Sequence, residues 1–542
     1  MKHLLRIALI GALSLLLASP RLQAQTKVGN KPERLEWFRD LAFGMFIHWN
    51  VDGTLGGVIS HSLVGASKDY SDRYFADLPK LFNPRKYNPD EWAELAKLAG
   101  MQYVVFTSKH HAGFCMWDTK TTPFNVMNTP YGKDLQKELV AAFRKQGIAV
   151  GFYFSPDDFL WLYKNGKPVA RHPHPGVTPA ENPGLLELDK AQIRELLKNY
   201  GKIDFFFIDG PEGGLRELCW ELDPDIVVTR GAIETPEQFI PGLPLAGAWE
   251  ANLTMGTEWP YKPTNETYKS GQSLIRTLIE TRAKGGNLLL NVGPKPDGEL
   301  PIEQEDRLRE VALWMFVNRE AIWNTRPWVV TNEDGVWFTS NKTQDTLYVI
   351  VTDAWKYGEP KTLTLKSVAA SGKTTISVLG QTGDLVEYRP QVKPEASFTQ
   401  TPEGLKLTAW KAQRLYTNNQ WPNPVVIKLT NIKSGVTPPV IQTIAARWDA
   451  AKKAVIVEGK LDDLGKVAAV EVGFQYRVRP EATEFTSRPW TATALVSRTA
   501  TGTFTQEIRG LEAGQRYQFQ AIVKHPLLTL TAKDVVLTIP QS

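Results

Sequence analysis

The sequence predicts a multidomain protein: a TIM-like (β/α)8 barrel over residues 25–327, a β-sandwich over 328–435 and a second β-sandwich over 440–542. Short apolar strands alternate with amphipathic helices through the first region, and this alternation requires a parallel sheet. Polar residues follow these strands at their carboxyl ends, which favours a closed barrel over an open sheet. After Trp328 the helical pattern stops, and short alternating segments indicate all-β domains.

The N-terminus has the pattern of a secretory signal peptide over residues 1–24. Lys2 and Arg6 precede an apolar run from Ile7 to Ala18, and Ala24 ends a short segment typical of a cleavage site. The apolar run is too short to span a bilayer. We therefore expect export to the periplasm or the medium, with cleavage near Ala24.

Charge and cysteine content exclude several classes of protein. Removal of the leader takes away three cations and lowers the formal net charge from +5 to +2, so nucleic-acid binding is not predicted. Cys115 and Cys219 are too few for a disulfide scaffold, and each is expected to be a buried thiol. No zinc, P-loop or dinucleotide signature occurs, so no cofactor is predicted.

The first three strands of the predicted barrel lie at 43–49, 103–109 and 149–154. Each is an apolar run with polar residues at its end. The helix after the first strand has Asn88 as N-cap and Pro89 at its first position, and Gly100 stops it. A second amphipathic helix, at 135–147, separates the next two strands, so the pattern repeats.

The most apolar strand is 204–210, a run of aromatic and aliphatic residues that ends in Asp209 and Gly210. Such a run is typical of a parallel strand buried on both faces. A carboxylate at its end is either part of a site or the start of an Asp-Gly turn. Further strands are predicted at 226–229, 244–249 and 285–294. Seven strands are legible, which is compatible with a barrel of eight.

Seven polar residues belong to the predicted strand ends: His48, His110, His111, Tyr153, Asp209, Arg230 and Glu250. The carboxyl ends of barrel strands meet at one opening, so we expect these side chains to surround one site. Two carboxylates among hydrogen-bond donors suit glycoside hydrolysis, with one as nucleophile and the other as proton donor. The histidines lack metal-ligand spacing, so no metal is predicted.

Alternating segments predict the two sandwiches, at 347–351, 362–365, 425–429, 472–478 and 517–523. Residues 435–439 predict a linker between them. The stretch from Leu511 to Tyr517 is similar to the tyrosine corner of a fibronectin type III domain. We expect this last domain to bind or to space rather than to catalyse.

Four motifs, in this order, resemble the α-L-fucosidases of glycoside hydrolase family 29. They are Phe43-Gly44-Met45-Phe46-Ile47-His48-Trp49, Ser108-Lys109-His110-His111-x-Gly113-Phe114, Trp249-Glu250 with Thr254-Met255-Gly256 and Trp259, and Gly285-Gly286-Asn287-Leu288-Leu289-Leu290-Asn291-Val292-Gly293-Pro294. The resemblance covers roughly residues 30–430 and includes the sandwich that follows the barrel in that family.

This resemblance implies a retaining hydrolase acting on a terminal α-L-fucosyl unit of an oligosaccharide or polysaccharide. Asp209 stands where the family has its nucleophile, and Glu250 where many members have the acid/base. The residues implied to hold the sugar are His48, His110, His111, Tyr153, Arg230, Asp72 and Trp249. No cofactor is implied.

Several residues depart from the family pattern. Phe207-Ile208-Asp209-Gly210 replaces Trp-Phe-Asp-Gly, Ala112 replaces the usual Asp, and Ser71-Asp72-Arg73-Tyr74 replaces Ser-Glu-Trp-Tyr. These departures leave open a related substrate such as an α-L-galactoside. They also predict narrower or shifted specificity. A lectin-like binder on a decayed barrel is a further alternative, since fold alone does not fix function, but the presence of both Asp209 and Glu250 argues against it. Glu258 and Glu266, in the polar loop after Glu250, are the other candidates for the acid/base.

Overall fold

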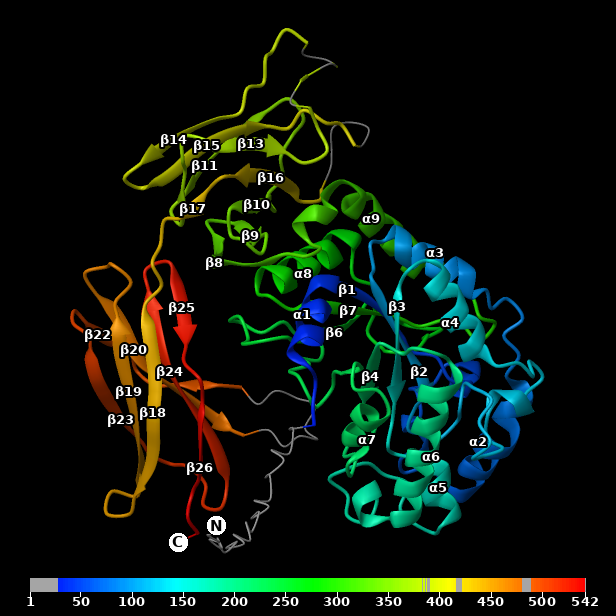
Figure 1. Ribbon diagram of the computed structural model, residues 1–542. Coiled ribbons are helices and arrows are strands. Elements are labelled where there is room, and N and C mark those ends of the chain that lie inside the picture. The colour runs from blue at the N-terminus through cyan, green and yellow to red at the C-terminus, as the bar shows by residue number, and fades with distance from the viewer. Residues whose placement is uncertain are drawn as a thin grey trace, which may run out of the picture.

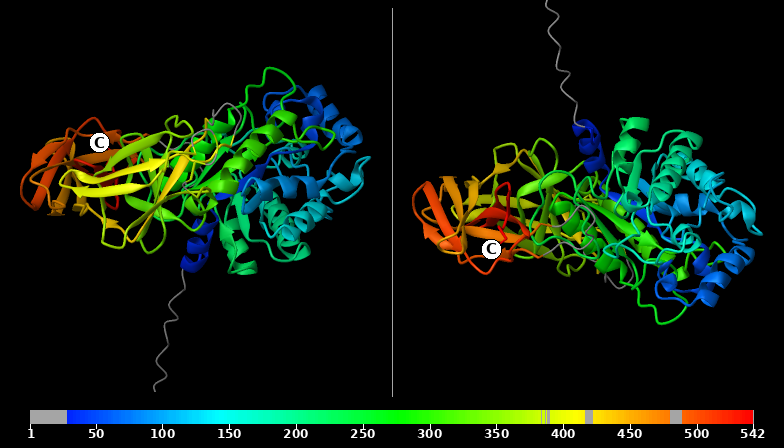
Figure 2. Two further views of the ribbon diagram at one scale, coloured as in Figure 1. Left: turned by 90° about the horizontal axis from the view of Figure 1, so that it is seen from above. Right: turned by 90° about the horizontal axis from the view of Figure 1, so that it is seen from below.

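The computed structural model describes residues 28–541, except 383, 386, 388, 389, 416–421 and 480–488. The predicted signal peptide lies outside these residues. In Figure 1 the chain passes from an N-terminal part of helices and strands, through a β-rich middle part, to a β-rich C-terminal part. The C-terminal strands lie at one end of the molecule and the blue and cyan helices at the other (Figure 2).

The N-terminal part is built on seven parallel strands in the order β5-β4-β3-β2-β1-β7-β6. They are β1 (Phe43–Ile47), β2 (Tyr103–Lys109), β3 (Ala149–Phe154), β4 (Phe205–Ile208), β5 (Val227–Val228), β6 (Glu250–Thr254) and β7 (Asn287–Val292). Almost every residue in them is buried, because side chains fill the inside of the curled sheet and helices cover its outside.

The helices of this part cover the sheet between successive strands (Figure 1). They are α1 (Pro32–Leu41), α2 (Lys68–Leu81), α3 (Pro89–Leu98), α4 (Leu135–Lys145), α5 (Phe159–Lys164), α6 (Pro183–Asn199), α7 (Leu215–Leu222), α8 (Gly271–Ala283) and α9 (Ile302–Asn318). Asp134 caps α4, because its side chain accepts a hydrogen bond from the Lys137 backbone N–H. Within the described ranges, every helix is too short or too polar to cross a bilayer.

An irregular segment, residues 234–238, takes the place of the remaining barrel strand. The backbone N–H of Glu250 donates to Glu234 O at 3.0 Å, and that of Asn252 donates to Pro236 O at 2.8 Å. The Gln238 N–H donates back to Asn252 O at 2.9 Å. These bonds satisfy the edge of β6 that faces away from β7, so the domain is TIM-like.

The predicted strand at 244–249 is wrong. Residues 240–248 contain no strand, and β6 begins at Glu250, where the sequence pattern placed a strand end. Glu250 pairs with Asn287, the first residue of β7, so it lies at the amino end of the sheet. The true strand was hidden because Asn252 and Thr254 are polar although both are buried.

The middle part contains antiparallel sheets around a core of its own that includes Phe338, Val349 and Leu407. One sheet has the order β13-β16-β10-β9-β8, from β8 (Arg326–Glu333), β9 (Val336–Ser340), β10 (Thr346–Val351), β13 (Thr375–Val378) and β16 (Val425–Thr430). The others pair β11 (Pro360–Leu365), β15 (Gly404–Trp410) and β14 (Ser397–Thr401), and β12 (Val368–Ala369) with β17 (Lys433–Ser434).

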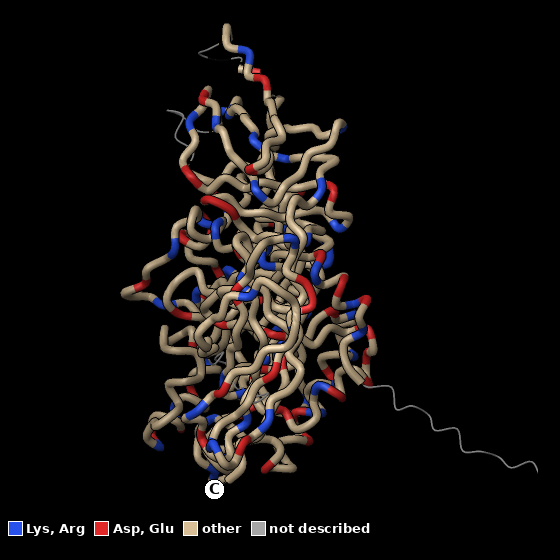
Figure 3. Tube along the Cα trace, turned by 90° about the vertical axis from the view of Figure 1, so that its left-hand side faces the viewer, with Lys and Arg blue, Asp and Glu red and all other residues tan. Residues whose placement is uncertain are grey.

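The C-terminal part packs two antiparallel sheets around Val457, Phe474 and Phe519. The first sheet contains β18 (Val440–Asp449), β19 (Ala454–Asp463) and β23 (Gly502–Ile508). The second contains β20 (Val470–Val478), β21 (Thr491–Ala492), β22 (Val496–Arg498), β24 (Arg516–His525), β25 (Leu528–Thr531) and β26 (Val535–Thr538). Basic and acidic residues are interspersed along the whole trace (Figure 3).

Candidate active site

A cavity of about 80 Å³ joins the ends of several barrel strands. Its polar lining consists of His48, His61, His110, His111, Tyr153, Arg171, Asp209, Arg230, Glu237, Asn252 and Glu258. Its apolar lining consists of Phe46, Val58, Ile59, Phe207, Trp259 and Pro260. Six of the predicted site residues therefore surround one cavity: His48, His110, His111, Tyr153, Asp209 and Arg230.

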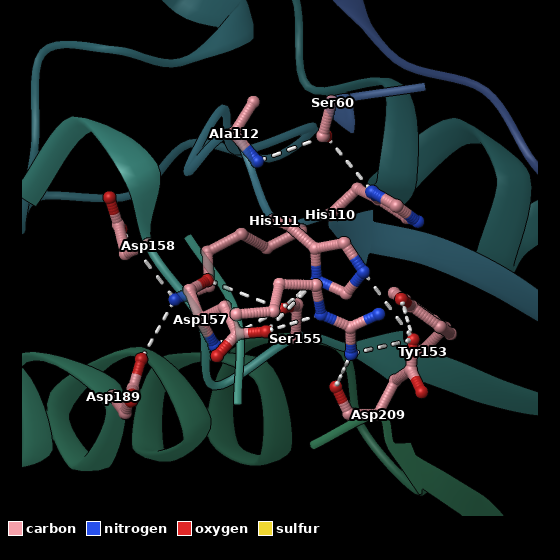
Figure 4. Close-up of polar contacts among 12 residues, drawn as sticks. Ser60, His110, His111, Ala112, Tyr153, Ser155, Asp157, Asp158, Asp189 and Asp209 are labelled. Carbon is pink, nitrogen blue, oxygen red and sulfur yellow. Dashed lines mark hydrogen bonds and ion pairs between the residues drawn. The ribbon is translucent and has the colours of Figure 1, made fainter. Parts of the chain in front are cut away.

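Asp209 follows β4 directly, and its carboxylate is held from several sides (Figure 4). The Tyr153 hydroxyl donates to Asp209 Oδ2 at 2.5 Å. Arg230 Nε lies 3.2 Å from Oδ1, and Arg171 Nη2 lies 3.8 Å from Oδ2. Burial raises the pKa of Asp209, but Arg230, Arg171 and the Tyr153 hydrogen bond outweigh it and lower the pKa below its usual value. The carboxylate is therefore ionised at neutral pH.

The turn after Asp209 explains the Asp-Gly pair. Gly210 has φ +153°, and an added Cβ would lie 2.9 Å from Pro156 Cγ. Only glycine fits this backbone conformation without strain. The Asp-Gly pair therefore forms a turn and also places a carboxylate at the end of the strand.

His48 presents a hydrogen-bond acceptor to the cavity. Asn291 Nδ2 donates to Trp259 O at 2.6 Å, which orients the amide and leaves its Oδ1 to accept from His48 Nδ1 at 2.6 Å. Burial lowers the pKa of His48 to about 4, so the ring is neutral at pH 7. The other ring nitrogen, Nε2, then carries the lone pair.

The two adjacent histidines are fixed by serine hydroxyls. His110 Nδ1 lies 2.9 Å from Ser60 Oγ, and His111 Nδ1 lies 2.6 Å from Ser155 Oγ. Ser60 Oγ also accepts from the Ala112 N–H at 2.9 Å. Burial lowers the pKa of both histidines well below the usual value, so both rings are neutral. The neutral rings can donate to or accept from hydroxyl groups.

Glu250 does not reach the cavity, contrary to the prediction. Its side chain is fully buried at the amino end of β6, and the Tyr103 hydroxyl donates to Oε2 at 2.6 Å. Burial raises the pKa of Glu250 to about 7. A raised pKa is typical of a proton donor, but here it results from burial at the end of the sheet that is remote from Asp209.

Trp249 and Asp72 are also outside the cavity. Trp249 is 1% exposed and precedes β6, where its ring packs so closely that a Cβ on Gly286 would lie 2.5 Å from it. Asp72 is an exposed residue of α2 that pairs with Lys68 at 2.6 Å and accepts from the Tyr163 hydroxyl at 2.7 Å. Both side chains are engaged elsewhere.

Two other carboxylates line the cavity, and they differ in their partners. Glu237 accepts from Arg230 Nη2 at 2.6 Å. Glu258 lies in the loop after β6 and is partly exposed, and no residue in the described part of the chain gives its carboxylate a hydrogen bond or an ion pair. Glu266 is not part of the cavity lining. Its Oε1 accepts a hydrogen bond from the Thr257 N–H at 2.7 Å.

Several lining residues were not predicted from the sequence. His61 begins a short 3-10 helix, and Arg171 and Glu237 belong to a loop and an irregular segment, so none of them carries a strand signal. Asn252 lies within β6, and its buried amide nitrogen and oxygen have no partner among the described residues. Buried amides are nearly always hydrogen-bonded. Because Asn252 also lines the cavity, its amide is available to a polar group there.

A buried ion pair beneath the site supports the two histidines. Lys109 Nζ lies 2.8 Å from Asp189 Oδ1 and 3.7 Å from Asp158 Oδ2, and all three side chains are almost fully buried. Figure 4 shows the two carboxylates converging on one amine nitrogen. Burial alone would lower the pKa of Lys109, but the two carboxylates raise it. The lysine therefore remains charged and fixes the strand end that bears His110 and His111.

Lys109→Met is expected to destabilise the protein by about 3 to 5 kcal/mol, because it leaves the Asp189 carboxylate buried without a cation. The measurement is urea unfolding at pH 7. Lys120→Met removes an exposed lysine that pairs with Asp118 at 2.6 Å and is the matched control. Little change is expected there, and an equal loss in both variants would contradict the buried-pair argument.

Glu250→Gln separates a structural carboxyl from a catalytic one. The folded-state pKa of about 7 lies above the ordinary value of 4.5, so stability is full below pH 4.5 and is lost as the pH rises through 7. The glutamine side chain does not ionise, so the variant lacks this loss. Relative to wild type, its free energy of unfolding should be up to about 3 kcal/mol more favourable at pH 8 than at pH 4.5. Thermal unfolding at both pH values checks this, and turnover is expected to stay within about threefold.

Comparisons with known proteins place these features in context. Residues 12–320 match the profile of the Alpha-L-fucosidase family. The chain is 30% identical over 393 residues to an alpha-L-fucosidase of Branchiostoma floridae, which covers 64% of this chain and 84% of that protein.

Solved structures give the same relationship. Alpha-L-fucosidase isoenzyme 1 of Paenibacillus thiaminolyticus superposes with a TM-score of 0.60 and 27% identity, covering 73% of this chain and 98% of that one. A Thermotoga maritima alpha-fucosidase in complex with fucose superposes with a TM-score of 0.57 and 26% identity, covering 73% and 96%.

Proposed function

Because the chain belongs to the alpha-L-fucosidase family, we propose that the cavity binds the terminal α-L-fucosyl unit of a glycan and that Asp209 is the nucleophile. The observation that carries this assignment is the position of Asp209, ionised at the end of β4 and held by Tyr153 and Arg230. The enzyme is a glycoside hydrolase that works with retention of configuration through a covalent glycosyl-Asp intermediate.

The first half of the reaction forms the intermediate. A carboxylate oxygen of Asp209 attacks the anomeric carbon, the bond from that carbon to the leaving oxygen breaks, and this oxygen takes a proton from a carboxylic acid. In the second half, a water oxygen attacks the anomeric carbon and the water proton goes to the same acid residue. The bond from that carbon to Asp209 breaks as the water attacks, and its electron pair returns to the carboxylate.

We assign the acid/base role to Glu258 in place of Glu250. Glu258 lines the cavity that contains Asp209, whereas Glu250 lies at the other end of the strands. Glu258 also has no protein partner within the described ranges to compete with the leaving oxygen. Glu237 is the second candidate, but its ion pair with Arg230 favours the ionised form.

The cavity also favours fucose over a sugar with a hydroxyl at C6. Phe46, Phe207 and Trp259 supply an apolar wall, which suits a methyl group. We expect an aryl α-L-fucoside to be cleaved about ten to a hundred times more efficiently than the matching α-L-galactoside, since an apolar wall rejects an added hydroxyl only moderately. Equal kcat/KM values for the two would contradict the assignment of fucose.

The test of the function is hydrolysis of an aryl α-L-fucoside by the purified protein, followed by proton NMR of the first product. Retention predicts α-L-fucose as the first anomer. Initial release of β-L-fucose would contradict the covalent mechanism, and binding without turnover would favour a lectin.

The predicted shift in substrate specificity rested on Asp72, Arg73 and Ala112, and the structure removes part of that support. Asp72 and Arg73 are exposed, and Arg73 pairs with Asp69 at 2.7 Å on the surface of α2. Ala112 is fully buried. We therefore expect His61, Val58 and Ile59 of the cavity lining to set the specificity for the glycan beyond the fucosyl unit. Comparing turnover of branched fucosylated oligosaccharides with that of an aryl fucoside measures this specificity.

The C-terminal part is proposed to be a fibronectin type III-like module. Its two antiparallel sheets support this, as does Tyr517, whose hydroxyl accepts from the Glu512 backbone N–H at 3.2 Å. Export is proposed on the leader pattern of residues 1–24 alone. N-terminal sequencing of the protein from the culture medium and from the periplasm tests it, with Gln25 expected near the new N-terminus.

A further inference from the structure

Arg171 is a cavity-lining residue that is anchored by a buried carboxylate. It belongs to the connection between α5 and α6, and its Nε donates to Asp157 Oδ2 at 2.7 Å. Asp157 is fully buried. Arg171 Nη2 donates to the backbone carbonyl oxygen of Asp209 at 3.3 Å and lies 3.8 Å from Oδ2 of the same residue. Arg171 therefore donates to the main chain of Asp209 and also lies near its carboxylate.

The two arginines approach different oxygens of Asp209. Arg230 faces Oδ1, and Arg171 faces Oδ2 together with the Tyr153 hydroxyl. The titratable and charged groups that face or act on this carboxylate are His48, His61, His111, Tyr153, Asp157, Arg171 and Arg230. The histidines have lowered pKa values, so the two guanidinium groups supply the positive charge.

We propose that Arg171, anchored by Asp157, is a positioning residue that acts through Asp209 on the second half-reaction, the hydrolysis of the glycosyl-enzyme ester. This inference rests on the proposed function. The proposal gives a role to Arg171, a loop residue that lies outside the motifs at the strand ends.

The reason is the change of charge on Asp209 in the two steps. In the first step the carboxylate loses its negative charge, so a nearby cation stabilises the starting state more than the transition state. In the second step the neutral ester regains that charge as its bond to the anomeric carbon breaks. A fixed cation near Oδ2 stabilises this developing charge and speeds the step.

The experiment compares Arg171→Gln with wild type on a nitrophenyl α-L-fucoside, whose good leaving group makes the first step fast. We expect kcat to fall by about tenfold or more and KM to fall at least in parallel, so that kcat/KM is lowered by less than about threefold or rises. A burst of nitrophenol close to one equivalent of enzyme should appear in the variant, because the ester accumulates. Arg171→Lys keeps the charge and should recover most of kcat.

The pH profile gives a second readout. Loss of the cation raises the pKa of Asp209, so the acid limb of kcat/KM should move to higher pH in Arg171→Gln. Arg194→Gln makes the same charge change on the exposed face of α6 and is the matched control, with no burst and no shift expected. Should Arg171→Gln fail to fold, Asp157→Asn, which removes the anchor, is expected to give the same split of kcat and KM.

Equal losses of kcat and kcat/KM, without a burst and with an unmoved acid limb, would overturn the proposal and leave Arg171 as a support of its loop. Wild-type turnover in the same assays keeps the two hypotheses separate. If wild type itself cleaves no fucoside, the proposed function is wrong and this role with it.

Discussion

Asp209→Ala is expected to lower turnover of an aryl α-L-fucoside by about four orders of magnitude or more, because the variant has no group to form the covalent intermediate. Its fold should be unchanged. The side chain is a partner of Tyr153, Arg230 and Arg171 at the rim of the barrel and does not belong to the apolar core.

The control for this variant lies at the other end of the same strand segment. Asp204→Asn removes a carboxylate that pairs with Arg34 at 3.4 Å just before β4. Its turnover should stay within about threefold of wild type. Circular dichroism and thermal unfolding establish that both variants are folded. Activity of Asp209→Ala within tenfold of wild type would contradict the assignment.

Glu258→Ala is expected to have an effect that depends on the leaving group. A phenolate with a low pKa departs without a proton, whereas a sugar oxygen does not. The variant should therefore keep part of its glycosylation rate on a nitrophenyl fucoside. Its turnover of a fucosylated oligosaccharide should fall by about three orders of magnitude or more. Added azide, which needs no general base, should restore the second step and give a fucosyl azide.

Two other glutamates serve as matched controls for Glu258. Glu250→Gln tests the carboxyl at the amino end of β6, and Glu266→Ala tests a loop carboxylate bonded to Thr257. Neither should show azide rescue. If Glu237→Ala shows leaving-group dependence and azide rescue while Glu258→Ala does not, the acid/base role belongs to Glu237.

Much of the barrel could be predicted because its strands are apolar on both faces. The runs around Phe46, Val105 and Phe206 are distinct from the helices between them, and the polar residue after each run marks the carboxyl end. His48, His110, His111, Asp209 and Arg230 were therefore brought together correctly. Their convergence follows from the parallel direction of the strands.

The errors come from the region where the barrel is irregular. Residues 234–238 form isolated backbone bonds rather than a regular strand, and β6 has the polar residues Asn252 and Thr254 in its interior. The apolar run before Glu250 was therefore taken for the strand, and Glu250 was predicted at the carboxyl end of a strand whose amino end it forms. Arg171 and His61 could not be predicted, since loop geometry brings them to the cavity and no periodic pattern records it.

Covalent labelling identifies the residue that carries the intermediate, which is proposed to be Asp209. The enzyme would be inactivated with 2-fluoro-fucosyl fluoride, digested and analysed by tandem mass spectrometry. We expect one fluorofucosyl group per chain, on Asp209, and none in Asp209→Ala. A label on Glu237 or Glu258 in the inactivated wild-type enzyme would contradict it.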